Sequence, residues 1–228
     1  MQFNLNQYYF NNTFILENLS TRMRDKLLST VQKRKYKAKK LIYREGKSPK
    51  GLYVLRKGKV KIYQTGQDSV KQIMYIYTPG EMFGYRPIIC EEVHPVSAVA
   101  LEDCSCDFIP RAHFEKCLLE SNELCRVLIK SLSHEFTVWV NNISVFARYP
   151  VKSRVALGLL ILQEKFRTRE KSNEVKLSRQ ELASYIGTVK EMVVRVIGEL
   201  RRQKIVETQG SRIRILKPEV LKTMVQFY

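Results

Sequence analysis

The hydrophobic pattern of the chain changes several times along its length. Between Lys35 and Phe114, short runs of apolar residues are separated by glycines, which is typical of β-strands joined by turns. The runs that predict strands are Leu41–Tyr43, Leu52–Leu55, Val60–Tyr63, Ile73–Tyr77 and Ser97–Ala100, and the glycines expected at turns are Gly46, Gly51, Gly58, Gly66, Gly80 and Gly84. Several short strands at regular spacing favour a compact sandwich or barrel. A short helix is predicted ahead of them, from about Ser20 to Val31.

A long helix is predicted from Ser121 to about Arg148, because neither Gly nor Pro interrupts the chain before Pro150. Its apolar residues are spaced alternately four and three positions apart: Cys125, Ile129, Leu132, Phe136, Trp139, Ile143 and Phe146. Such an a/d seam over three heptads indicates either a helix that pairs with a second helix or one packed on the chain's own β-domain. Residues 149–150 predict a hinge, and an apolar helix follows from Val151 to Phe166.

Two short helices joined at Gly187 are predicted between Leu177 and Leu200. Ser178 with Glu181, and Thr188 with Glu191, match the capping box that opens a helix. The apolar side of the first helix is Leu182, Ala183 and Ile186; the buried stripe of the second is Val193, Val196, Ile197 and Leu200, and Lys190, Glu191, Val194 and Arg195 lie off that stripe. A helix-turn-helix presents this end of its second helix to DNA. The alternative is an ordinary helix pair with a surface salt bridge between Glu191 and Arg195.

A β-hairpin is predicted directly after the second short helix. Residues 205–208 and 212–216 are strand-like runs, and residues 209–211 form a short turn between them. A hairpin in this place is a wing. Ser211 and Arg212 at its tip are candidates for contact with a phosphate, and the alternative is a purely structural hairpin.

The composition indicates a polyanionic partner. The 228 residues include 40 Lys and Arg against 22 Asp and Glu, a formal net charge of +18. Up to Ala147 there are 22 basic and 14 acidic residues, and after it 18 and 8, so the excess is denser in the half that holds the two short helices. We favour DNA binding, with a merely basic, soluble surface as the alternative.

Other chemistry is weakly represented. No apolar run reaches transmembrane length and no secretion leader opens the chain, so we expect a cytoplasmic protein. The five cysteines match no zinc spacing and are expected to be buried free thiols, with a redox pair in Cys104 and Cys106 as the alternative: Cys90, Cys104, Cys106, Cys117 and Cys125. The three histidines form no motif, and there is neither a P-loop nor a nucleophile elbow. These observations argue against an enzyme or small-molecule-binding protein in which the helix-turn-helix is incidental.

The segment from Ser178 to Arg195 resembles the DNA-binding domain of the catabolite activator–Fnr (Crp/Fnr) family of bacterial regulators. The shared pattern is a hydroxyl-Arg-Gln-Glu run at 178–181, a Gly at 187, and a basic-Glu pair at 190–191 followed by Arg195. The resemblance implies base contacts from Lys190, Glu191 and Arg195, and positions at or near the DNA backbone for Ser178, Arg179, Gln180 and Val189. Lys and Arg suit guanine, and Glu can accept from cytosine.

Further segments resemble the cyclic-nucleotide-binding β-roll of the same family, so the resemblance extends from about Phe14 to Leu216. They are Glu45–Gly46, Tyr53–Leu55, Gly58–Val60, Pro79–Gly84 and Ser97–Asp103. The resemblance implies an α+β fold with an N-terminal β-roll (jelly roll), a long dimerisation helix and a C-terminal winged helix-turn-helix. We expect these parts at residues 1–120, 121–149 and 150–228, with a parallel homodimer formed along the apolar seam.

The effector region departs from the family pattern. Members that bind cyclic AMP have a Glu after the glycine at position 84, where this chain has Tyr85, and an Arg-Ser pair near His94, where Pro95 and Val96 follow. Neither Pro nor Val can donate a hydrogen bond to a phosphate in that place. The candidate effector residues are Gly84, Tyr85, Arg86, His94, Trp139 and Val140, of which the last two replace hydroxyl residues on the long helix. We therefore expect no cyclic AMP binding of the usual kind, and we assign no metal or cofactor. His94, with no partner at ligand spacing, is expected to be an ordinary loop residue, and the alternative is a metal or haem ligand.

The sequence thus predicts a homodimeric, sequence-specific transcription regulator. Its partners are double-stranded DNA and RNA polymerase, and two recognition helices about 34 Å apart require a near-palindromic site. The alternatives are a non-specific, nucleoid-type DNA-binding protein and a regulator switched by an unidentified small molecule or redox signal.

Overall fold

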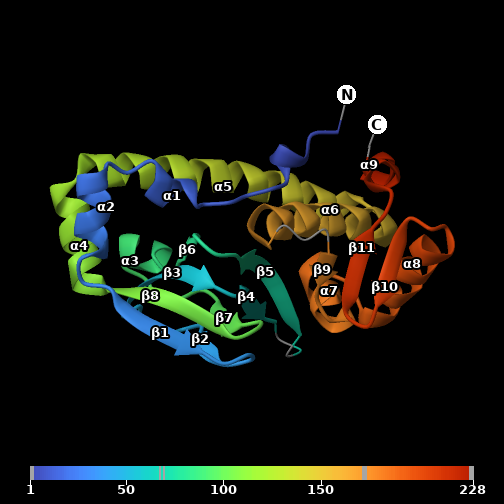
Figure 1. The fold of residues 1–228 in the computed structure, drawn as a ribbon, viewed down its shortest axis with the longest axis horizontal. Coiled ribbons are helices and arrows are strands. Elements are labelled where there is room, and N and C mark those ends of the chain that lie inside the picture. Colours follow the sequence, from blue (N-terminus) through green and yellow to red (C-terminus); the bar gives the residue numbers. More distant parts are fainter. Residues whose placement is uncertain (1–2, 67, 69, 171–173, 226–228) are drawn as a thin grey trace. The chain divides into compact units, whose positions relative to one another are not determined.

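The structure is a computed structural model that describes residues 3–66, 68, 70–170 and 174–225 (Figure 1). The chain divides into two compact units, one made of Asn11–Glu135 and the other of Met1–Phe10 together with Phe136–Tyr228. We call the first the roll unit and the second the winged unit. The predicted α+β class, with a β-roll ahead of a winged helix-turn-helix, is confirmed.

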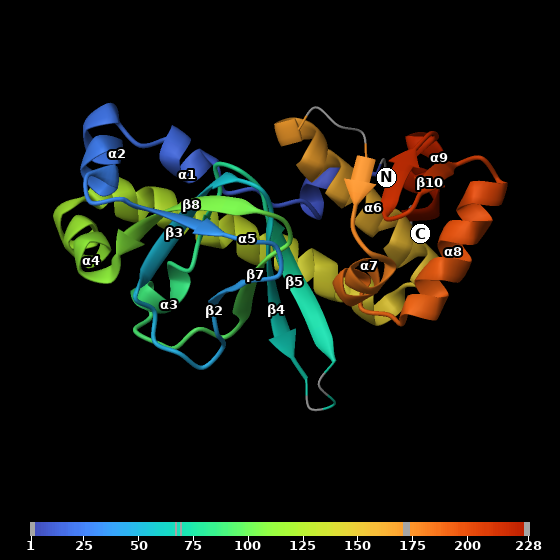
Figure 2. The same ribbon diagram turned by 60° about the horizontal axis from the view of Figure 1, so that its bottom comes forward.

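The roll unit contains two antiparallel four-stranded sheets, whose strands are drawn from blue to green in Figure 2. The strands are β1 (Gln32–Tyr36), β2 (Leu41–Tyr43), β3 (Gly51–Lys57), β4 (Val60–Thr65), β5 (Lys71–Tyr77), β6 (Met82–Phe83), β7 (Ser97–Ala100) and β8 (Cys104–Pro110). Their order is β1-β8-β3-β6 in one sheet and β2-β7-β4-β5 in the other. The helices are α1 (Phe14–Glu17), α2 (Thr21–Leu28), α3 (Arg86–Ile89), α4 (Arg111–Glu120) and the first half of α5 (Asn122–Arg148).

Strand β3 joins the two hydrophobic cores of the roll unit because it is apolar on both faces. Tyr53 and Leu55 enter the core between the sheets, while Leu52 and Val54 enter a second core against helices α1, α2, α4 and α5. A strand buried on both faces has a continuous apolar run instead of an alternating one.

The five predicted strands are all present, and the sequence pattern misses β1, β6 and most of β8. Strand β1 is a charged edge strand, and β6 has only two residues. The prediction that Gly51 lies at a turn is wrong, because it is the first residue of β3. A Cβ there would collide with the carbonyl oxygen of Ile109 and with the ring of Phe108, so a larger residue would push strand β8 away.

The winged unit packs helices against a small antiparallel sheet. Its elements are the 3₁₀-helix η1 (Leu5–Gln7), the second half of α5, α6 (Val151–Glu170), β9 (Glu174–Lys176), α7 (Arg179–Ile186), α8 (Lys190–Arg202), β10 (Val206–Gln209), β11 (Arg212–Ile215) and α9 (Pro218–Val225). The sheet order is β10-β11-β9. The fully buried side chains include Val155, Leu159, Leu162, Phe166, Leu182, Val193, Leu200, Ile213 and Leu221. The hairpin and the helix after Pro150 are confirmed, whereas β9 and α9 are missed by the sequence pattern.

The first residues of the chain belong to the winged unit although residues 11–135 form the other unit. The buried Lys165 of α6 donates from Nζ to the carbonyl oxygen of Phe10 at 3.3 Å, and its ammonium lies 5.8 Å from the ring centroid of Tyr9. Asn141 of α5 donates to the carbonyl oxygen of Gln7 at 2.8 Å. A buried ammonium needs such partners, so the N-terminal segment completes the packing of α6.

Candidate nucleic-acid interface

Helix α7 opens with the predicted capping box. The Oγ of Ser178 accepts from the backbone N–H of Glu181 at 3.1 Å, and the Glu181 carboxylate accepts from the backbone N–H of Ser178 at 3.2 Å. These bonds satisfy donors that the first turn of a helix leaves free. Ser178 and Gln180 are exposed, while Arg179 is half-buried and its burial lowers its pKa. The box therefore fixes the end of α7 on which the predicted backbone contacts lie.

The turn between α7 and α8 is closed by backbone hydrogen bonds around Gly187. Gly187 adopts a left-handed conformation with φ 72° and ψ 49°, and both its N–H and that of Thr188 donate to the carbonyl oxygen of Ala183. Because Thr188 takes part in this closure, the prediction that it caps α8 is wrong. The N-cap is Val189, which is extended and offers no side-chain acceptor.

Arg154 of α6 holds this turn from outside the helix-turn-helix. Its Nη1 donates to the carbonyl oxygen of Gly187 at 2.9 Å and to that of Ile186 at 3.3 Å. A cation suits the carbonyl end of a helix. Sequence reasoning missed this residue, since nothing in the pattern of α6 marks it.

Helix α8 buries the predicted stripe and exposes the predicted contact residues. Val193, Val196, Ile197 and Leu200 are buried, whereas Lys190, Glu191 and Arg195 are exposed. Among the residues that the structure describes, none of these three makes an ion pair or a side-chain hydrogen bond, so the alternative Glu191–Arg195 salt bridge is not formed. Val189 and Val194 are 59% and 49% exposed beside them. The exposed side of α8 near its N-terminus, which we call the front of α8, thus carries polar side chains without partners among the described residues. These side chains are able to hydrogen-bond to base edges.

The wing is a hairpin that turns at Gly210 and the exposed Ser211. Strand β11 pairs with β10 on one side and with β9 on the other. Glu174 of β9 pairs with Arg214 at 2.9 Å and more loosely with Arg212 at 3.8 Å. Arg212 remains more than half exposed, so its guanidinium can still approach a phosphate. Strand β9 holds the hairpin in place through its pairing with β11.

The predicted effector residues of the roll unit are buried in the core or already paired with other side chains of that unit. Gly84 has a φ of 81°, and Tyr85 after it is buried in the core against α4 and α5. Arg86 forms a charge-assisted hydrogen bond with Glu135 of α5, whose side chain is only 7% exposed. Arg86, the candidate replacement for the missing phosphate-binding Arg, therefore already has its charge neutralised by a carboxylate.

Aromatic rings occupy the space between the sheets. The buried His94 stacks on Tyr43 with centroids 3.9 Å apart, and the ring of Phe83 stacks on Tyr53 at 5.0 Å and on Tyr77 at 5.1 Å. Burial raises the pKa of Tyr43 and Tyr77 well above the ordinary value, so both hydroxyls are neutral. His94 lies in a loop, as predicted, but its ring is part of this buried layer.

Comparison with known proteins agrees with this architecture. The cyclic nucleotide-binding domain family matches residues 33–121, and the Crp-like helix-turn-helix domain family matches residues 153–224. The transcriptional activator protein Anr of Pseudomonas protegens is 29% identical over 188 residues, which cover 81% of this chain and 77% of Anr. This chain belongs to the Crp/Fnr family of transcription regulators.

Two more proteins are similar to this Crp/Fnr regulator over most of its length. The structure of FixK2 from Bradyrhizobium japonicum superposes with a TM-score of 0.78 at 23% identity, covering 87% of this chain and 99% of FixK2. The cAMP-activated global transcriptional regulator Vfr of Pseudomonas aeruginosa is 27% identical over 193 residues, covering 82% of this chain and 90% of Vfr. Family membership makes the chain a DNA-binding transcription regulator rather than an enzyme.

Helix α5 of this Crp/Fnr regulator has two adjacent apolar faces. Each residue of the second face follows directly after a position of the first face in the sequence. The inner face is buried and consists of Leu124, Leu128, Ser131, Glu135, Val138 and Val145. The predicted seam is the neighbouring face, on which Ile129, Phe136, Ile143 and Phe146 are exposed and Cys125, Leu132 and Trp139 are partly buried. Phe136 is 71% exposed and Ile129 63%, so these large apolar side chains are mostly open to solvent.

The cysteines are free thiols, although the prediction that all are buried is wrong: Cys90 is exposed and Cys125 only partly covered. Cys104 and Cys106 both point into the core of the roll, and burial raises the pKa of Cys106 to about 12. In the described part of the chain, no group of three or more His, Cys, Asp or Glu is arranged to hold a metal. No described helix is long and apolar enough to cross a membrane.

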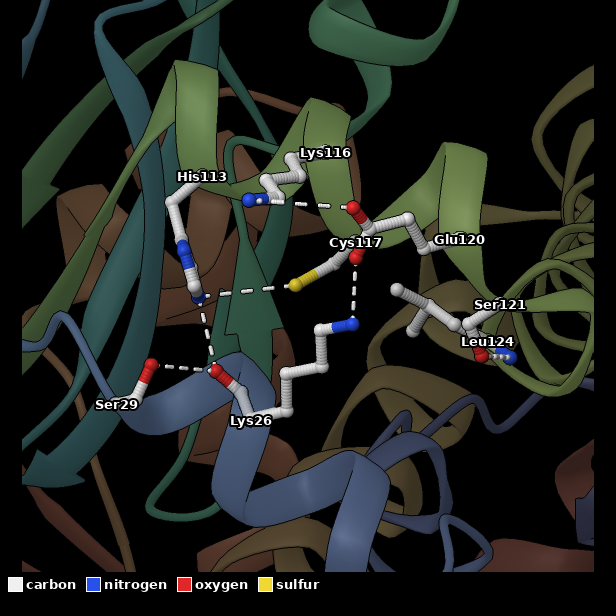
Figure 3. Close-up of polar contacts among 8 residues, drawn as sticks. All are labelled: Lys26, Ser29, His113, Lys116, Cys117, Glu120, Ser121 and Leu124. Carbon is white, nitrogen blue, oxygen red and sulfur yellow. Dashed lines mark hydrogen bonds and ion pairs between the residues drawn. The ribbon is translucent and has the colours of Figure 1, made fainter.

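A Cys-His pair on α4, which faces the end of α2, has a structural role (Figure 3). His113 Nε2 lies 2.9 Å from the carbonyl oxygen of Lys26 and 3.6 Å from the Sγ of Cys117. A carbonyl oxygen can only accept, so this nitrogen carries a proton and cannot deprotonate the thiol. Burial raises the pKa of Cys117 as well. The pair therefore fastens the end of α2 to α4 and does not form a nucleophile.

The buried His94 predicts acid sensitivity of the roll. Burial lowers its pKa from the ordinary value of 6.5 to about 4, so protons bind the unfolded chain first as the pH falls. The free energy of unfolding should drop between pH 6.5 and 4, by about 3 kcal/mol from this group alone. His94→Phe keeps a ring against Tyr43 but cannot titrate, and urea unfolding of both proteins at pH 7 and pH 4 measures the difference. Equal losses in the two proteins would contradict the assignment.

Proposed function

We propose that this Crp/Fnr regulator binds a near-palindromic DNA site as a homodimer and does so without cyclic AMP. The observation that carries the proposal lies at the N-terminal front of α8. There Lys190, Glu191 and Arg195 are exposed and form no ion pairs among the described residues. Those three residue types make directional hydrogen bonds to guanine and cytosine edges. Ser178, Arg179, Gln180 and Val189 would position α8 on the backbone, together with Ser211 and Arg212 of the wing.

The exposed seam of α5 supports the dimer. Large apolar side chains at 60% exposure or more, repeated at heptad spacing, are the surface that a second copy of the same helix covers. A twofold pair of α8 helices then reads two half-sites about 34 Å apart. RNA polymerase is the further partner that we propose for a bound dimer.

The side chains of the roll unit support the proposal that DNA binding does not require cyclic AMP. A cyclic phosphate needs a cation, and Arg86 is held by Glu135; a ribose needs an acceptor, and the position after Gly84 holds a tyrosine buried in the core. Releasing Arg86 would leave a buried carboxylate uncompensated, which costs several kcal/mol. Trp139 and Val140 remain proposed effector residues on α5, since an unidentified ligand of other chemistry is compatible with them.

Selection of bound DNA from a random pool, followed by binding of the selected duplex, tests the proposal. We expect an inverted-repeat consensus, and an affinity for it at least about a thousandfold above that for random DNA, unchanged by cyclic AMP. Calorimetry should show no binding of cyclic AMP at concentrations up to about 1 mM. Equal affinity for all sequences would indicate a nucleoid-type protein, and micromolar binding of cyclic AMP would overturn the second part.

A further inference from the structure

The chain connects its two units twice. One connection is helix α5, in which Glu135 belongs to the roll unit and Phe136 to the winged unit. The other lies near the start of the chain, where Phe10 belongs to the winged unit and Asn11 to the roll unit. Residues 7–12, which we call the N-terminal link, carry this second connection. They are neither proposed DNA contacts nor candidate effector residues.

The first part of the N-terminal link is anchored on helices α5 and α6 of the winged unit. The carbonyl oxygen of Gln7 accepts from Nδ2 of Asn141 at 2.8 Å. The carbonyl oxygen of Phe10 accepts from Nζ of the buried Lys165 at 3.3 Å, and the Phe10 side chain is buried as well. An ammonium taken out of water needs polar partners, so this carbonyl helps to hold Lys165 in the interior.

Tyr9 extends this anchor to the first helix of the helix-turn-helix. Its ring centroid lies 5.8 Å from the Lys165 ammonium. Burial is the main cause of the raised pKa of Tyr185 in α7, and the phenol of Tyr9 adds to it, so Tyr9 lies near this helix. A Cβ on Gly158 of α6 would lie 3.1 Å from Ile186, which shows how closely α6 packs on the end of α7. The N-terminal link is therefore part of the packing that supports the turn before α8.

The second part of the N-terminal link is anchored on strand β6 of the roll unit. The fully buried Asn12 donates from Nδ2 to the carbonyl oxygen of Met82 at 2.7 Å, and its Oδ1 accepts from the Met82 N–H at 2.9 Å. Strand β6 is the edge of its sheet, so this amide takes the place of a neighbouring strand. The effector region from Gly84 to Arg86 follows β6 directly. The anchor thus holds the strand from which the effector region begins.

One residue, Asn11, stands between the two anchors. Its Oδ1 accepts from the backbone N–H of Thr13 at 2.8 Å, so the connection is an ordered turn. Consecutive Cα atoms are about 3.8 Å apart, and the two peptide units from Phe10 to Asn12 leave little slack. A displacement of β6 must therefore either shift the anchor on α6 or break one of these hydrogen bonds.

We infer that the N-terminal link couples the effector region to the helix-turn-helix and positions the helix-turn-helix for DNA. It acts beside α5, through anchors of its own. With both anchors formed, the support of α7 is ordered before DNA arrives, so less conformational freedom is lost on binding. With either anchor broken, more freedom is lost and the affinity should fall. This coupling rests on the proposed function, because it is expressed as affinity for the selected duplex.

Insertion of Gly-Gly between Phe10 and Asn11 tests the coupling while keeping both anchors. We expect the insertion to weaken binding of the selected duplex about fivefold, measured by fluorescence anisotropy, and N12A, which breaks the anchor on β6, to do the same. In N12A combined with the insertion, the loss should equal that of the insertion alone, because the lengthened link no longer transmits the change. Losses that multiply in the combined variant overturn the inference, as does an unchanged affinity with the insertion.

The matched controls are S97A and a Gly-Gly insertion between Lys47 and Ser48. The buried Ser97 accepts at Oγ from the backbone N–H of Glu45 at 3.0 Å, so S97A also removes a buried hydrogen bond from the roll unit. Lys47 and Ser48 are exposed loop residues between β2 and β3. Both controls should bind DNA as the native protein does. A loss in S97A equal to that in N12A would assign the effect to lower stability of the roll unit, and if N12A fails to fold, the two insertions decide.

Hydrogen exchange gives a second readout that needs no DNA. In N12A, exchange in α6 and α7 should be faster than in the native protein, although the substitution lies in the roll unit, whereas S97A should leave it unchanged. Equal exchange in N12A and the native protein would overturn the inference. Failure of the native protein to prefer the selected duplex over random DNA would instead refute the proposed function, and the exchange result would still decide the role of the N-terminal link.

Discussion

Phe136→Glu is expected to convert the dimer into monomers and to weaken DNA binding by at least about 100-fold. A dimer engages two half-sites at once, whereas a monomer loses the gain from linking them. Phe136 lies near the middle of the seam and is the most exposed of its apolar residues at 71%. A carboxylate there would be buried against its twofold copy, where two like charges in an apolar environment repel strongly. Analytical ultracentrifugation and anisotropy with the selected duplex measure the two effects.

The control for this variant is Ser144→Glu, which adds the same charge to an exposed position of α5 outside the seam. It should remain dimeric and bind DNA normally. The thermal stability of the Phe136→Glu monomer should be close to that of Ser144→Glu at low protein concentration, because Phe136 makes little contact within its own chain. A dimer that persists in Phe136→Glu would refute the parallel pairing along this seam.

The predictable part of this fold is the part in which one periodicity dominates. Spacing alone separated the outer face of α5 from its neighbours, and the structure leaves that face uncovered while it buries the face one residue earlier. The capping box at Ser178 and the glycine at 187 were equally readable, because each is a local motif whose bonds connect residues within one turn. Such features do not depend on distant parts of the chain.

What the sequence could not reveal depends on partners far away in the chain. Thr188 and Glu191 match a capping box, yet the closure of the preceding helix uses the Thr188 N–H, and α8 begins one residue later. Arg154 stabilises the turn from another helix, and Lys165 meets a carbonyl oxygen 155 residues earlier in the chain. Neither residue breaks the pattern of its own helix, so only the tertiary structure identifies them.

The effector region has some features that a local motif reveals and others that depend on contacts between distant segments. The sequence shows that the residues for cyclic AMP are replaced, which needs only a comparison of residue types with a motif. It does not show that Arg86 is bound by Glu135, or that His94 stacks on Tyr43, because these pairs join segments about 50 residues apart. The altered motif and the occupied space support the same conclusion through independent observations.

Arg195→Ala is expected to lower affinity for the selected site by about 1–3 kcal/mol per half-site, or between about fivefold and more than a hundredfold for each, and twice that free energy for the dimer. The loss should fall on one base pair of each half-site, because a guanidinium that donates twice to guanine discriminates against every other base. Arg195 is exposed and makes no ion pair among the described residues, so its removal should not destabilise α8. Glu191→Ala should relax preference at a different base pair by a similar amount per half-site.

Arg202→Ala provides the matched comparison, since Arg202 is exposed in the last turn of the same helix and away from its N-terminal front. We expect it to weaken binding to selected and random DNA alike, with a shallower salt slope and the consensus unchanged. Binding of both variants to a panel of single-base substitutions of the site separates base reading from charge. A uniform loss across the panel for Arg195→Ala would mean that it contacts only phosphate, and base recognition would then have to come from Lys190 and Glu191.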